Sequence, residues 1–537
     1  MTRWGMVIDL NRCVGCQTCT AACKHANDTP PGVQWRRVLD IEQGVYPDVE
    51  RVFLVVGCQH CADPPCVPVC PTGATKQRAD GLVTMDYDTC IGCAYCAVAC
   101  PYQARTIVDH HEYYYGEPSK QELAHYPDER IGVANKCTFC VERVDEAEAT
   151  GLTPGLDLEV TPACSAACIA SAIHFGDFAD PQSNVSRLLA ENQYFQMHEE
   201  LGTDPQIKYL YEVANTTPGR DADPGDLDDD ALSDPENPLV GQRQTWWDYK
   251  AAMNFGLGGL AAGLAVVAWL AYLAAGLPAT SLGGAYVVAA ALMAVGLFFV
   301  LLKIKRRLRA LKVLRRPQSS WMTRETYCVA VFYPAVLADL VWPHPVLHAL
   351  VAAAAAGFLV SQALILQRAK GIPAWRVALM PWMLVATALL EGTGLLALGL
   401  AATGTTTLLA QTAALTGAVL TLVNAGLWYR YRTTAKANGI PPLSRRQIDA
   451  VTPLLHVVGH ALPLLLFAAA WLAGGGGLSH LALAVGGIFA VSGGLGWKLR
   501  IITQAGYFQG FALPKLPQRG SGSRAAPPRL TALAAAG

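Results

Sequence analysis

The hydrophobic pattern changes near residue 245 of this 537-residue chain. From Met253 onward, long apolar runs alternate with short polar connections, and no charged residue stands between Lys250 and Lys303. Runs of about 18 to 24 apolar residues can cross the hydrocarbon core of a bilayer as helices. The pattern therefore predicts an all-α bundle of eight transmembrane helices, at residues 252–274, 283–304, 325–342, 345–367, 377–400, 405–428, 452–473 and 478–499.

Before residue 240 the apolar stretches are short. Trp4 to Ile8, Val52 to Val56 and Leu82 to Met85 are typical of small strands. The segment 204–240 is polar and acidic, which predicts a solvated linker, with a docking strip for a basic partner as the alternative. We expect an α+β domain over residues 1–200, an acidic linker over 201–245, the membrane domain over 246–510 and a flexible tail over 511–537.

Charge separates the same two parts of the chain. Residues 1–240 carry 16 Lys and Arg against 37 Asp and Glu, whereas the rest carries 25 against 5. Bases that alternate with apolar runs form no continuous patch, so we expect no nucleic-acid binding.

The positions of the bases predict the orientation in the membrane. They gather before the first predicted span, around the connections after the second, fourth and sixth, and around the end of the eighth. By the positive-inside rule this side is cytoplasmic, and with eight spans both termini lie there. Residues 1–10 resemble no signal peptide and contain no twin arginine. We therefore expect a multi-pass protein of a prokaryotic inner membrane, with its first domain in the cytoplasm.

Sixteen of the 17 cysteines fall into four sets of four. Two sets have the bacterial ferredoxin spacing Cys-x2-Cys-x2-Cys-x3-Cys, in which three cysteines hold one 4Fe-4S cluster and the fourth ligates another. The short gaps let a tight loop aim three thiolates at one cluster, while the longer gap moves the last thiolate onto a helical turn. The sets are Cys13, Cys16, Cys19 and Cys23; Cys58, Cys61, Cys66 and Cys70; Cys90, Cys93, Cys96 and Cys100; and Cys137, Cys140, Cys164 and Cys168.

Other roles for these cysteines fit the spacing less well. Structural zinc usually takes two separated pairs of ligands, so a Cys-x2-Cys-x2-Cys run leaves one thiolate without a place. Disulfides are typical of small secreted domains, and buried structural cysteines would not keep this spacing four times. The repeat predicts two ferredoxin modules, one inserted in the other, in which the first set pairs with the fourth and the second with the third.

Four clusters in one domain predict a route for single electrons, which needs a redox partner at each end. The membrane domain points to quinone, a two-electron carrier that dissolves in lipid. The sequence contains no dinucleotide or flavin motif, so the other partner must be a redox centre on another polypeptide.

Residues 3 to about 180 resemble the four-cluster electron-transfer subunit of the dimethyl sulfoxide reductase superfamily of molybdopterin enzymes. The similarity includes Cys23-Lys24-x2-Asn27 and Gln59-His60-Cys61-x2-Pro64-Pro65-Cys66. Residues 246 to about 510 resemble the quinone-reactive membrane anchor of that superfamily, with Ser320-Trp321-x2-Arg324-Glu325 as the best local match. Two subunits that are normally separate are fused here.

The resemblance implies which cysteines share a cluster. Cys13, Cys16, Cys19 and Cys168 would hold the cluster nearest the catalytic subunit, and Cys23, Cys137, Cys140 and Cys164 the next. Cys70, Cys90, Cys93 and Cys96 would hold a third, and Cys58, Cys61, Cys66 and Cys100 the one facing the membrane. All sixteen ligands are present, so we expect no three-iron cluster.

Candidates for the quinone site follow from their position near the cytoplasmic surface. Tryptophan and arginine at such a boundary also serve as interfacial anchors. The candidates are Trp246, Trp247, Trp321, Arg324, Glu325 and Tyr327.

Three further residues are candidates for a proton path. Glu391 stands deep in the fifth predicted span. His456 and His460, one helical turn apart, could protonate quinone or pack in the bundle. Haem b is the lesser alternative, because its two axial histidines usually come from facing helices.

The resemblance implies a subunit that moves electrons between a cytoplasmic molybdenum or tungsten enzyme and membrane quinone. A cytoplasmic partner favours oxidation of an intracellular substrate with reduction of quinone, as in sulfite dehydrogenases or phenylacetyl-CoA:acceptor oxidoreductases. The alternatives are electron transfer from ferredoxin to quinone without a molybdopterin partner, a quinol-driven reductase, and a metal-stabilised anchor or sensor.

Overall fold

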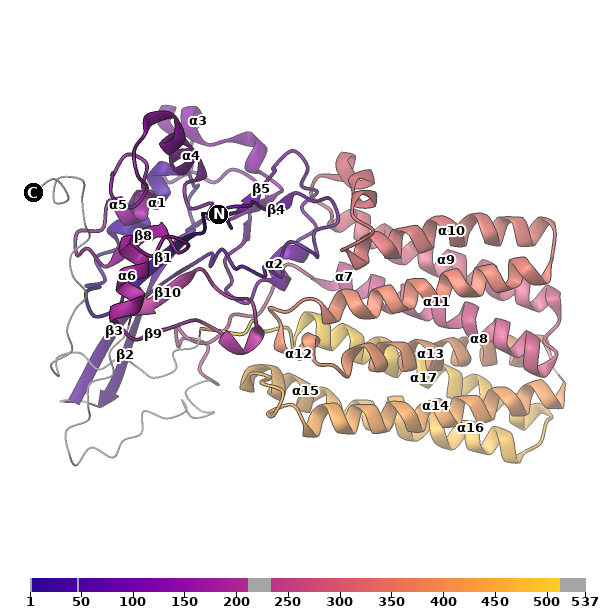
Figure 1. The fold of residues 1–537 in the computed structure, drawn as a ribbon. Coiled ribbons are helices and arrows are strands. Elements are labelled where there is room, and N and C mark those ends of the chain that lie inside the picture. Colours follow the sequence, from indigo (N-terminus) through magenta and orange to yellow (C-terminus); the bar gives the residue numbers. More distant parts are fainter. Residues whose placement is uncertain (1, 46–47, 211–232, 405, 512–537) are drawn as a thin grey trace, which may run out of the picture. The chain divides into compact units, whose positions relative to one another are not determined.

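The computed structural model describes residues 2–45, 48–210, 233–404 and 406–511. The chain divides into two compact units, Met1–Gln242 with Gln509–Gly537, and Arg243–Phe508. Each unit has a hydrophobic core of its own. In Figure 1 the first unit is indigo to magenta and the second is pink to yellow.

The first unit contains a four-stranded sheet with the strand order β8-β1-β10-β9 (Figure 1). The inner strand β1 (Trp4–Asp9) is parallel to β10 (Ile207–Leu210) and antiparallel to β8 (Ile173–Asp177), and β9 (Tyr194–Phe195) pairs antiparallel with β10. Met6, Val7 and Ile8 are fully buried. A strand that is apolar on both faces needs cover on both, and α6 (Asn184–Glu191) packs on one.

The rest of the first unit consists of short elements. Three antiparallel ribbons pair β2 (Arg36–Val45) with β3 (Asp48–Gly57), β4 (Thr75–Gln77) with β5 (Val83–Met85), and β6 (Thr106–Ile107) with β7 (Ala134–Asn135). The predicted strands near Trp4, Val52 and Leu82 are confirmed as β1, β3 and β5. The helices are α1 (Thr18–Ala26), α2 (Tyr95–Ala99), α3 (Lys120–His125), α4 (Val141–Thr150) and α5 (Ala163–Ala166), with 3-10 turns at Asp128–Arg130 and Glu199–Leu201.

The two loops with ferredoxin spacing share one backbone conformation. Gly15 and Gly92 have φ of 70° and 69°, and the residues two positions later, Gln17 and Ala94, have φ of 62° and 64°. Two left-handed residues in so short a loop curl it tightly before α1 and α2 begin. A side chain at Gly15 would also collide with the ring of Phe53. The repeat seen in the sequence is therefore a repeat of local structure.

The predicted linker and tail differ from the structure where the two can be compared. Strand β10 lies inside the range 201–245, because Ile207 and Tyr209 are fully buried in the sheet. Residues 211–232 of the predicted linker and 512–537 of the predicted tail lie outside the described residues. Phe511 belongs to the core of the first unit, and its N–H donates to the carbonyl of Leu239.

Helices occupy all eight ranges predicted for the second unit. Two of them contain a π-helical segment, at Asn254–Gly258 and Leu455–Ala461. A 3-10 helix at Arg307–Arg315 and the short α12 (Pro373–Arg376) lie in the connections. The long helices are α7 with α8 (Tyr249–Met253, Gly259–Ala275), α9 (Ala279–Lys303), α10 (Trp321–Val341), α11 (Pro345–Gln367), α13 (Met380–Thr403), α14 (Thr407–Thr433), α15 with α16 (Pro442–Leu454, Leu462–Leu472) and α17 (Gly477–Thr503).

Seven of these helices are long and apolar enough to cross a membrane. The eighth, α10, is 21 residues long but is not among the seven, so the predicted count of eight spans is not confirmed. Polar residues near both ends reduce its hydropathy, with Arg324 and Glu325 close to its start and Asp339 close to its end. α10 nevertheless packs along α11.

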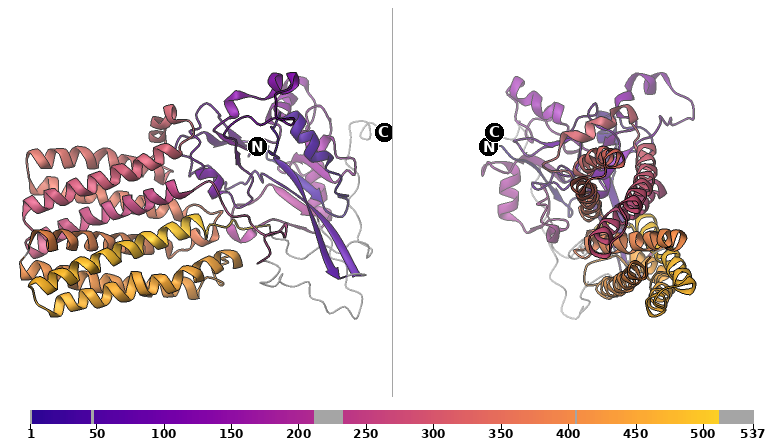
Figure 2. Two further views of the ribbon diagram at one scale, coloured as in Figure 1. Left: turned by 180° about the vertical axis from the view of Figure 1, so that it is seen from behind. Right: turned by 90° about the vertical axis from the view of Figure 1, so that its right-hand side faces the viewer.

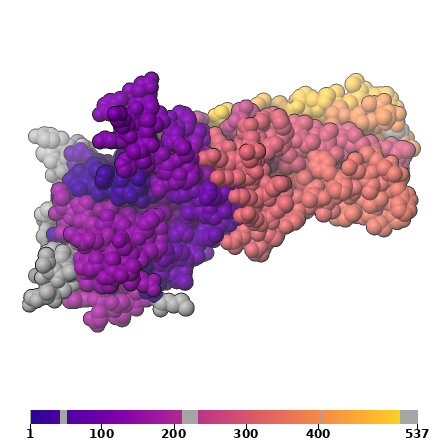
Figure 3. Space-filling model, turned by 90° about the horizontal axis from the view of Figure 1, so that it is seen from above, coloured from indigo at the N-terminus to yellow at the C-terminus, as the bar shows by residue number. Residues whose placement is uncertain are grey.

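Glycines allow the helices of the second unit to approach closely. Gly263 of α8 lies against Gly392 of α13, and Gly394 of α13 lies against Gly487 of α17, with no room for a Cβ atom at any of the four. Such contacts are typical of helix packing in lipid. The helices α8 to α11 form one group and α13 to α17 another, joined through α8 and α13. Figure 2 shows this unit from behind and nearly end-on, and Figure 3 shows it in a space-filling view.

Candidate metal centres

The cysteines regroup in space so that each ferredoxin-spaced motif is divided between two sets. The Cys19 thiol interacts electrostatically with Cys13, Cys168 and Cys164, while Cys23 interacts with Cys137, Cys164 and Cys140. Cys164 is therefore close to both groups. We call these groups the Cys13 set (Cys13, Cys19 and Cys168, with Cys16 included from the expected ligand set) and the Cys23 set (Cys23, Cys137, Cys140, Cys164).

The remaining eight cysteines form two more sets. The Cys61 thiol interacts with Cys58, Cys66 and Cys100, and the Cys96 thiol interacts with Cys90, Cys70 and Cys93. The second group lines a small cavity of about 10 Å³. We call them the Cys58 set (Cys58, Cys61, Cys66, Cys100) and the Cys70 set (Cys70, Cys90, Cys93, Cys96). Within the described ranges, no three His, Cys, Asp or Glu side chains meet closely enough to hold a single metal ion.

Most of these thiols are buried, and Cys16 is the only exposed one of the sixteen. Burial raises the pKa of Cys19 to about 11 and the pKa of Cys137 and of Cys100 to about 12. A buried thiol in such a place stays protonated at neutral pH unless a metal takes the place of the proton. The donor set therefore fits a group that brings its own positive charge.

Three cations are buried among the thiols. Arg36 and Lys136 are 0% exposed and Arg105 is 5% exposed. In the part of the chain that the structure describes, none of the three has a carboxylate partner, and Nε and Nη1 of Arg36 and Nη2 of Arg105 have no hydrogen-bond partner. A guanidinium does not lose its proton in proteins, so each arginine needs an anion nearby. Metal-bound thiolates would supply such an anion at these positions.

Donors to sulfur come from the backbone and from one amide side chain. The N–H groups of Gly92, Phe139 and Ala172 donate to Cys90, Cys137 and Cys168 Sγ at 3.4, 3.4 and 3.2 Å. Asn27 Nδ2 lies 3.7 Å from Cys23 Sγ and 3.8 Å from Cys140 Sγ, so it joins two motifs of the Cys23 set. Such bonds tune the reduction potential of a cluster.

The order of the sets differs from the predicted one. The Cys137 thiol interacts with Cys58, and His60 Nε2 lies 3.1 Å from the carbonyl of Cys137. Burial and Lys136 lower the pKa of His60, so the neutral ring donates from Nε2 and accepts from the Val83 N–H at Nδ1. The Cys58 set therefore adjoins the Cys23 set.

Arg105 connects the Cys58 set to the Cys70 set. It interacts with Cys66 and Cys96, which belong to one set each, and its Nη1 donates to Thr75 and Met85 on the wall of the Cys70 cavity. The Cys58 set thus lies between the Cys23 and Cys70 sets, whereas the expected order has the Cys70 set third and the Cys58 set facing the membrane. Sequence spacing could not reveal this order, because it depends on how the ribbons fold onto one another.

The six candidates for the quinone site do not converge on one pocket. Trp246 is half-buried, and Trp247 is buried in a stack with Trp375, whose ring centre lies 5.8 Å away. Arg324 covers the ring of Trp321 at 4.1 Å and donates to the carbonyls of Pro317 and Gln318.

The other two candidates on α10 also lie apart. The hydroxyl of Tyr327 donates to the carbonyl of Leu314, and its side chain is exposed. Glu325 instead points into the bundle beside Asn254 and Gln362. Its Oε1 is buried and has no hydrogen-bond partner among the described residues.

The three proton-path candidates lie in different surroundings. Glu391 pairs with Lys498 at 2.5 Å, and both side chains are at most 1% exposed. Lys498 is not among the candidates predicted from the sequence, because it stands with the bases at the end of the eighth predicted span, but a lysine inside an apolar run is a signal that could have found it. His456 is exposed on the helix surface, and its Nδ1 lies 3.3 Å from Nδ1 of buried His460.

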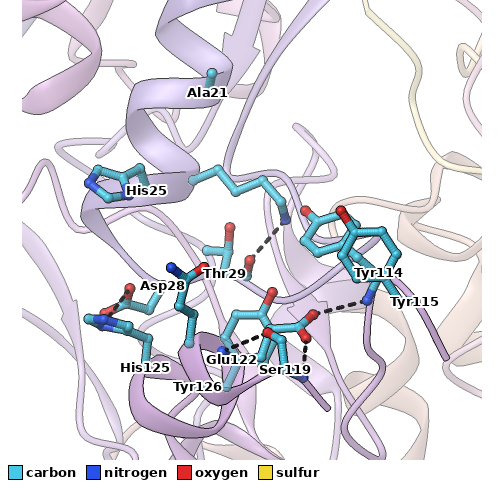
Figure 4. Close-up of a pocket in the computed structure, with 12 residues that line it drawn as sticks. Ala21, His25, Asp28, Thr29, Tyr114, Tyr115, Ser119, Glu122, His125 and Tyr126 are labelled. Atoms are coloured by element: carbon cyan, nitrogen blue, oxygen red, sulfur yellow. Dashed lines mark hydrogen bonds and ion pairs between the residues drawn. The ribbon is translucent and has the colours of Figure 1, made fainter. Parts of the chain in front are cut away.

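The first unit also contains an open pocket of about 770 Å³ that no sequence signal marked (Figure 4). One wall is α1, which carries Cys19 and Cys23, and the other is formed by residues 114–126. The charged groups are satisfied within the pocket: Lys24 donates to the carbonyls of Thr29 and Pro30, and Glu122 accepts from two backbone N–H groups.

Comparisons with known proteins agree with this chemistry. A family described as "4Fe-4S dicluster domain" matches residues 49–114, and one described as "4Fe-4S binding domain" matches residues 4–25.

Three curated relatives illustrate the similarity. A subunit of the selenate reductase of Mesobacillus selenatarsenatis is 40% identical over 225 residues, covering 39% of this chain and 72% of the relative. A subunit of the sulfite dehydrogenase of Allochromatium vinosum is 38% identical over 226 residues, covering 39% and 83%. The iron-sulfur cluster-binding subunit of menaquinone reductase from Nitratidesulfovibrio vulgaris is 36% identical over 228 residues, covering 39% and 88%.

Proposed function

Since the chain belongs to the family of iron-sulfur subunits of dimethyl sulfoxide reductase-type oxidoreductase complexes, we propose that it carries electrons through four 4Fe-4S clusters between a molybdenum or tungsten catalytic subunit and membrane quinone. The Cys13, Cys23, Cys58 and Cys70 sets would each hold one cluster. Each bound cluster would carry one electron at a time. The apolar helices of the second unit would anchor the chain in the membrane.

The observation that carries this proposal is the placement of buried cations among buried thiols. Arg36 and Arg105 have no carboxylate partner within the described residues, and both interact with cysteine thiols. Burial acts to lower the pKa of each arginine, but the nearby thiolates raise it overall. A protein that held neutral thiols here would leave two buried charges uncompensated, which is strongly destabilising.

The surface around the Cys13 set supports its assignment to the partner end of the route. Cys16 is exposed, and beside its set lie Val14 and Ile169, which are 54% and 72% exposed. Exposed apolar residues next to a redox centre are suited to bind a partner protein. We assign the exchange with quinone to the last set in the row, the Cys70 set.

Within the second unit, Glu325 is the residue best placed to serve quinone chemistry. Its buried carboxylate keeps one oxygen without a partner in the described part of the bundle, and Asn254 Oδ1 beside it also has none. Quinone reduction consumes protons, so a carboxyl group here could deliver them. Oxidation of a cytoplasmic substrate with quinone reduction is the direction that the positive-inside orientation favours.

Purification of the native complex under anaerobic conditions tests the proposal. We expect about 16 irons per chain, four paramagnetic centres on reduction, and a large co-purifying subunit with molybdenum or tungsten. A lone chain that reduces quinone from reduced ferredoxin would favour the alternative without a molybdopterin partner. Far fewer irons in anaerobic protein would contradict the electron-transfer role altogether.

A further inference from the structure

Each of two buried arginines lies beside two of the four cysteine sets. Arg36 interacts with Cys164, Cys137 and Cys23 of the Cys23 set, and Cys19 of the Cys13 set also interacts with Arg36. Arg105 interacts with Cys66, Cys58 and Cys100 of the Cys58 set and with Cys96 of the Cys70 set. Each arginine thus lies among the ligands of two neighbouring sets.

The hydrogen bonds of Arg105 hold its charge in place. Its Nη1 donates to Thr75 Oγ1 at 3.2 Å and to Met85 Sδ at 3.1 Å, and both residues line the cavity of the Cys70 set. Arg105 also follows Cys100, a ligand of the Cys58 set, by only five residues. The guanidinium is therefore fixed between two sets and cannot turn toward solvent.

We propose that Arg105 is a shared counter-cation that raises the reduction potentials of the two clusters held by the Cys58 and Cys70 sets. The inference rests on the proposed function, because it requires clusters at both sets. Accepting one electron adds one negative charge to a cluster, with no proton or bond change. A fixed positive charge in a low-dielectric interior stabilises that added charge, so the reduced form is favoured.

The position of Arg36 supplies a matched control for this role. It is an equally buried guanidinium, but it lies among the ligands of the Cys23 and Cys13 sets. If fixed charge sets the potentials, the two arginines should act on different pairs of clusters. If the arginines matter only for folding, replacing either one should not shift the potentials of one particular pair of clusters.

Redox titration of the full-length protein, monitored by electron paramagnetic resonance and iron analysis, tests the proposal. We expect Arg105→Gln to lower two of the four reduction potentials. At the wild-type midpoint potential, the ratio of reduced to oxidised cluster should fall about tenfold, which corresponds to a shift of about 59 mV for a one-electron couple. Arg36→Gln should shift the other two. Arg105→Lys, which keeps the charge, should stay close to the wild-type values.

Several outcomes would overturn the inference. One is an Arg105→Gln protein with full iron and four unchanged potentials, and another is an Arg105→Lys protein that shifts as far as Arg105→Gln. If both Arg105→Gln and Arg105→Met lose the iron of two clusters, Arg105 serves assembly and the tuning role fails. A wild-type protein without four clusters would instead contradict the proposed function itself.

Discussion

Among single residues, buried charge is the feature that links structure to function in both units. Arg36, Arg105 and Lys136 are buried beside thiols in the first unit, and Lys498 is buried against Glu391 in the second. A buried charge is tolerated only where an opposite charge accompanies it. In the second unit the opposite charge is a side chain, whereas in the first the proposed metal-bound thiolates would supply it.

Removing iron should therefore destabilise the first unit and spare the second. At neutral pH the freed thiols take up protons, since burial raises the pKa of Cys19 to about 11 and that of Cys137 to about 12. Arg36 and Arg105 would then lack a counter-charge. Hydrogen exchange on the full chain before and after anaerobic chelation should show faster exchange in β2 and β8 but not in α13 and α17. Equal acceleration in both units would refute this expectation.

The pair of Glu391 and Lys498 should behave as a buried ion pair in a double-mutant cycle. Glu391→Gln or Lys498→Met alone should cost about 3 kcal/mol or more of unfolding free energy, because each leaves an uncompensated charge, and the double variant should recover part of the loss. Thermal unfolding in detergent measures this. Asp449→Asn, which breaks the half-exposed pair with Arg432, is the control and should cost less than about 1 kcal/mol. Single variants that match the control would disprove the pairing.

Among the elements, tight loops and close helix contacts position the candidate sites. The left-handed residues before α1 and α2 curl both ferredoxin-spaced loops in the same way. In the second unit, glycines bring α8, α13 and α17 together around the Glu391 pair, and Gly494 of α17 leaves no room for a Cβ beside the Glu391 carboxylate. The polar ends of α10 keep it out of the seven helices that are apolar enough to cross a membrane.

Adding a methyl group at the contact between α8 and α13 should loosen the bundle. Gly392→Ala would place a Cβ against the backbone of Gly263, and such overpacking typically costs about 1 to 3 kcal/mol. Gly399→Ala on the same helix faces open space and should leave stability unchanged or slightly higher. Unfolding temperatures of the two variants in detergent would separate these outcomes, and equal temperatures would show that the contact is not close.

For the whole molecule, the fusion of two units implies a fixed topology in the membrane. The first unit has a large acidic excess, whereas bases gather at one set of helix ends in the second. A covalent connection removes the association step that separate subunits would need. The number of spans then decides on which side each connection lies.

Reporter fusions should place both termini and the basic connections in the cytoplasm. A reporter active only outside the cytoplasm should be inactive after Gly537 and active when fused at His344, between α10 and α11, if α10 crosses the membrane. Activity after Gly537 would overturn the proposed orientation. Inactivity at His344, with activity in the connection between α11 and α12 and after Gly537, would show that α10 does not cross, because the seven remaining spans place the C-terminus outside.

Local patterns in the sequence were sufficient to predict the secondary-structure elements and the iron-sulfur chemistry of the first unit. Apolar runs predicted helices in all eight ranges, and cysteine spacing predicted clusters, because both depend on residues only a few positions apart. The helix in the third range, α10, is not confirmed as a span, because its polar ends lower its hydropathy below that of the other seven.

Contacts between distant residues depended on the three-dimensional packing. Lys498 pairs with Glu391, and Cys137 lies near Cys58, although these residues are dozens to more than a hundred positions apart in the sequence. The six quinone candidates, in contrast, are separated by the packing. No periodicity encodes such distances, because they arise from how ribbons and helices pack. The same packing buries Arg105 between two cysteine sets, whereas its place in the sequence relates it only to Cys100.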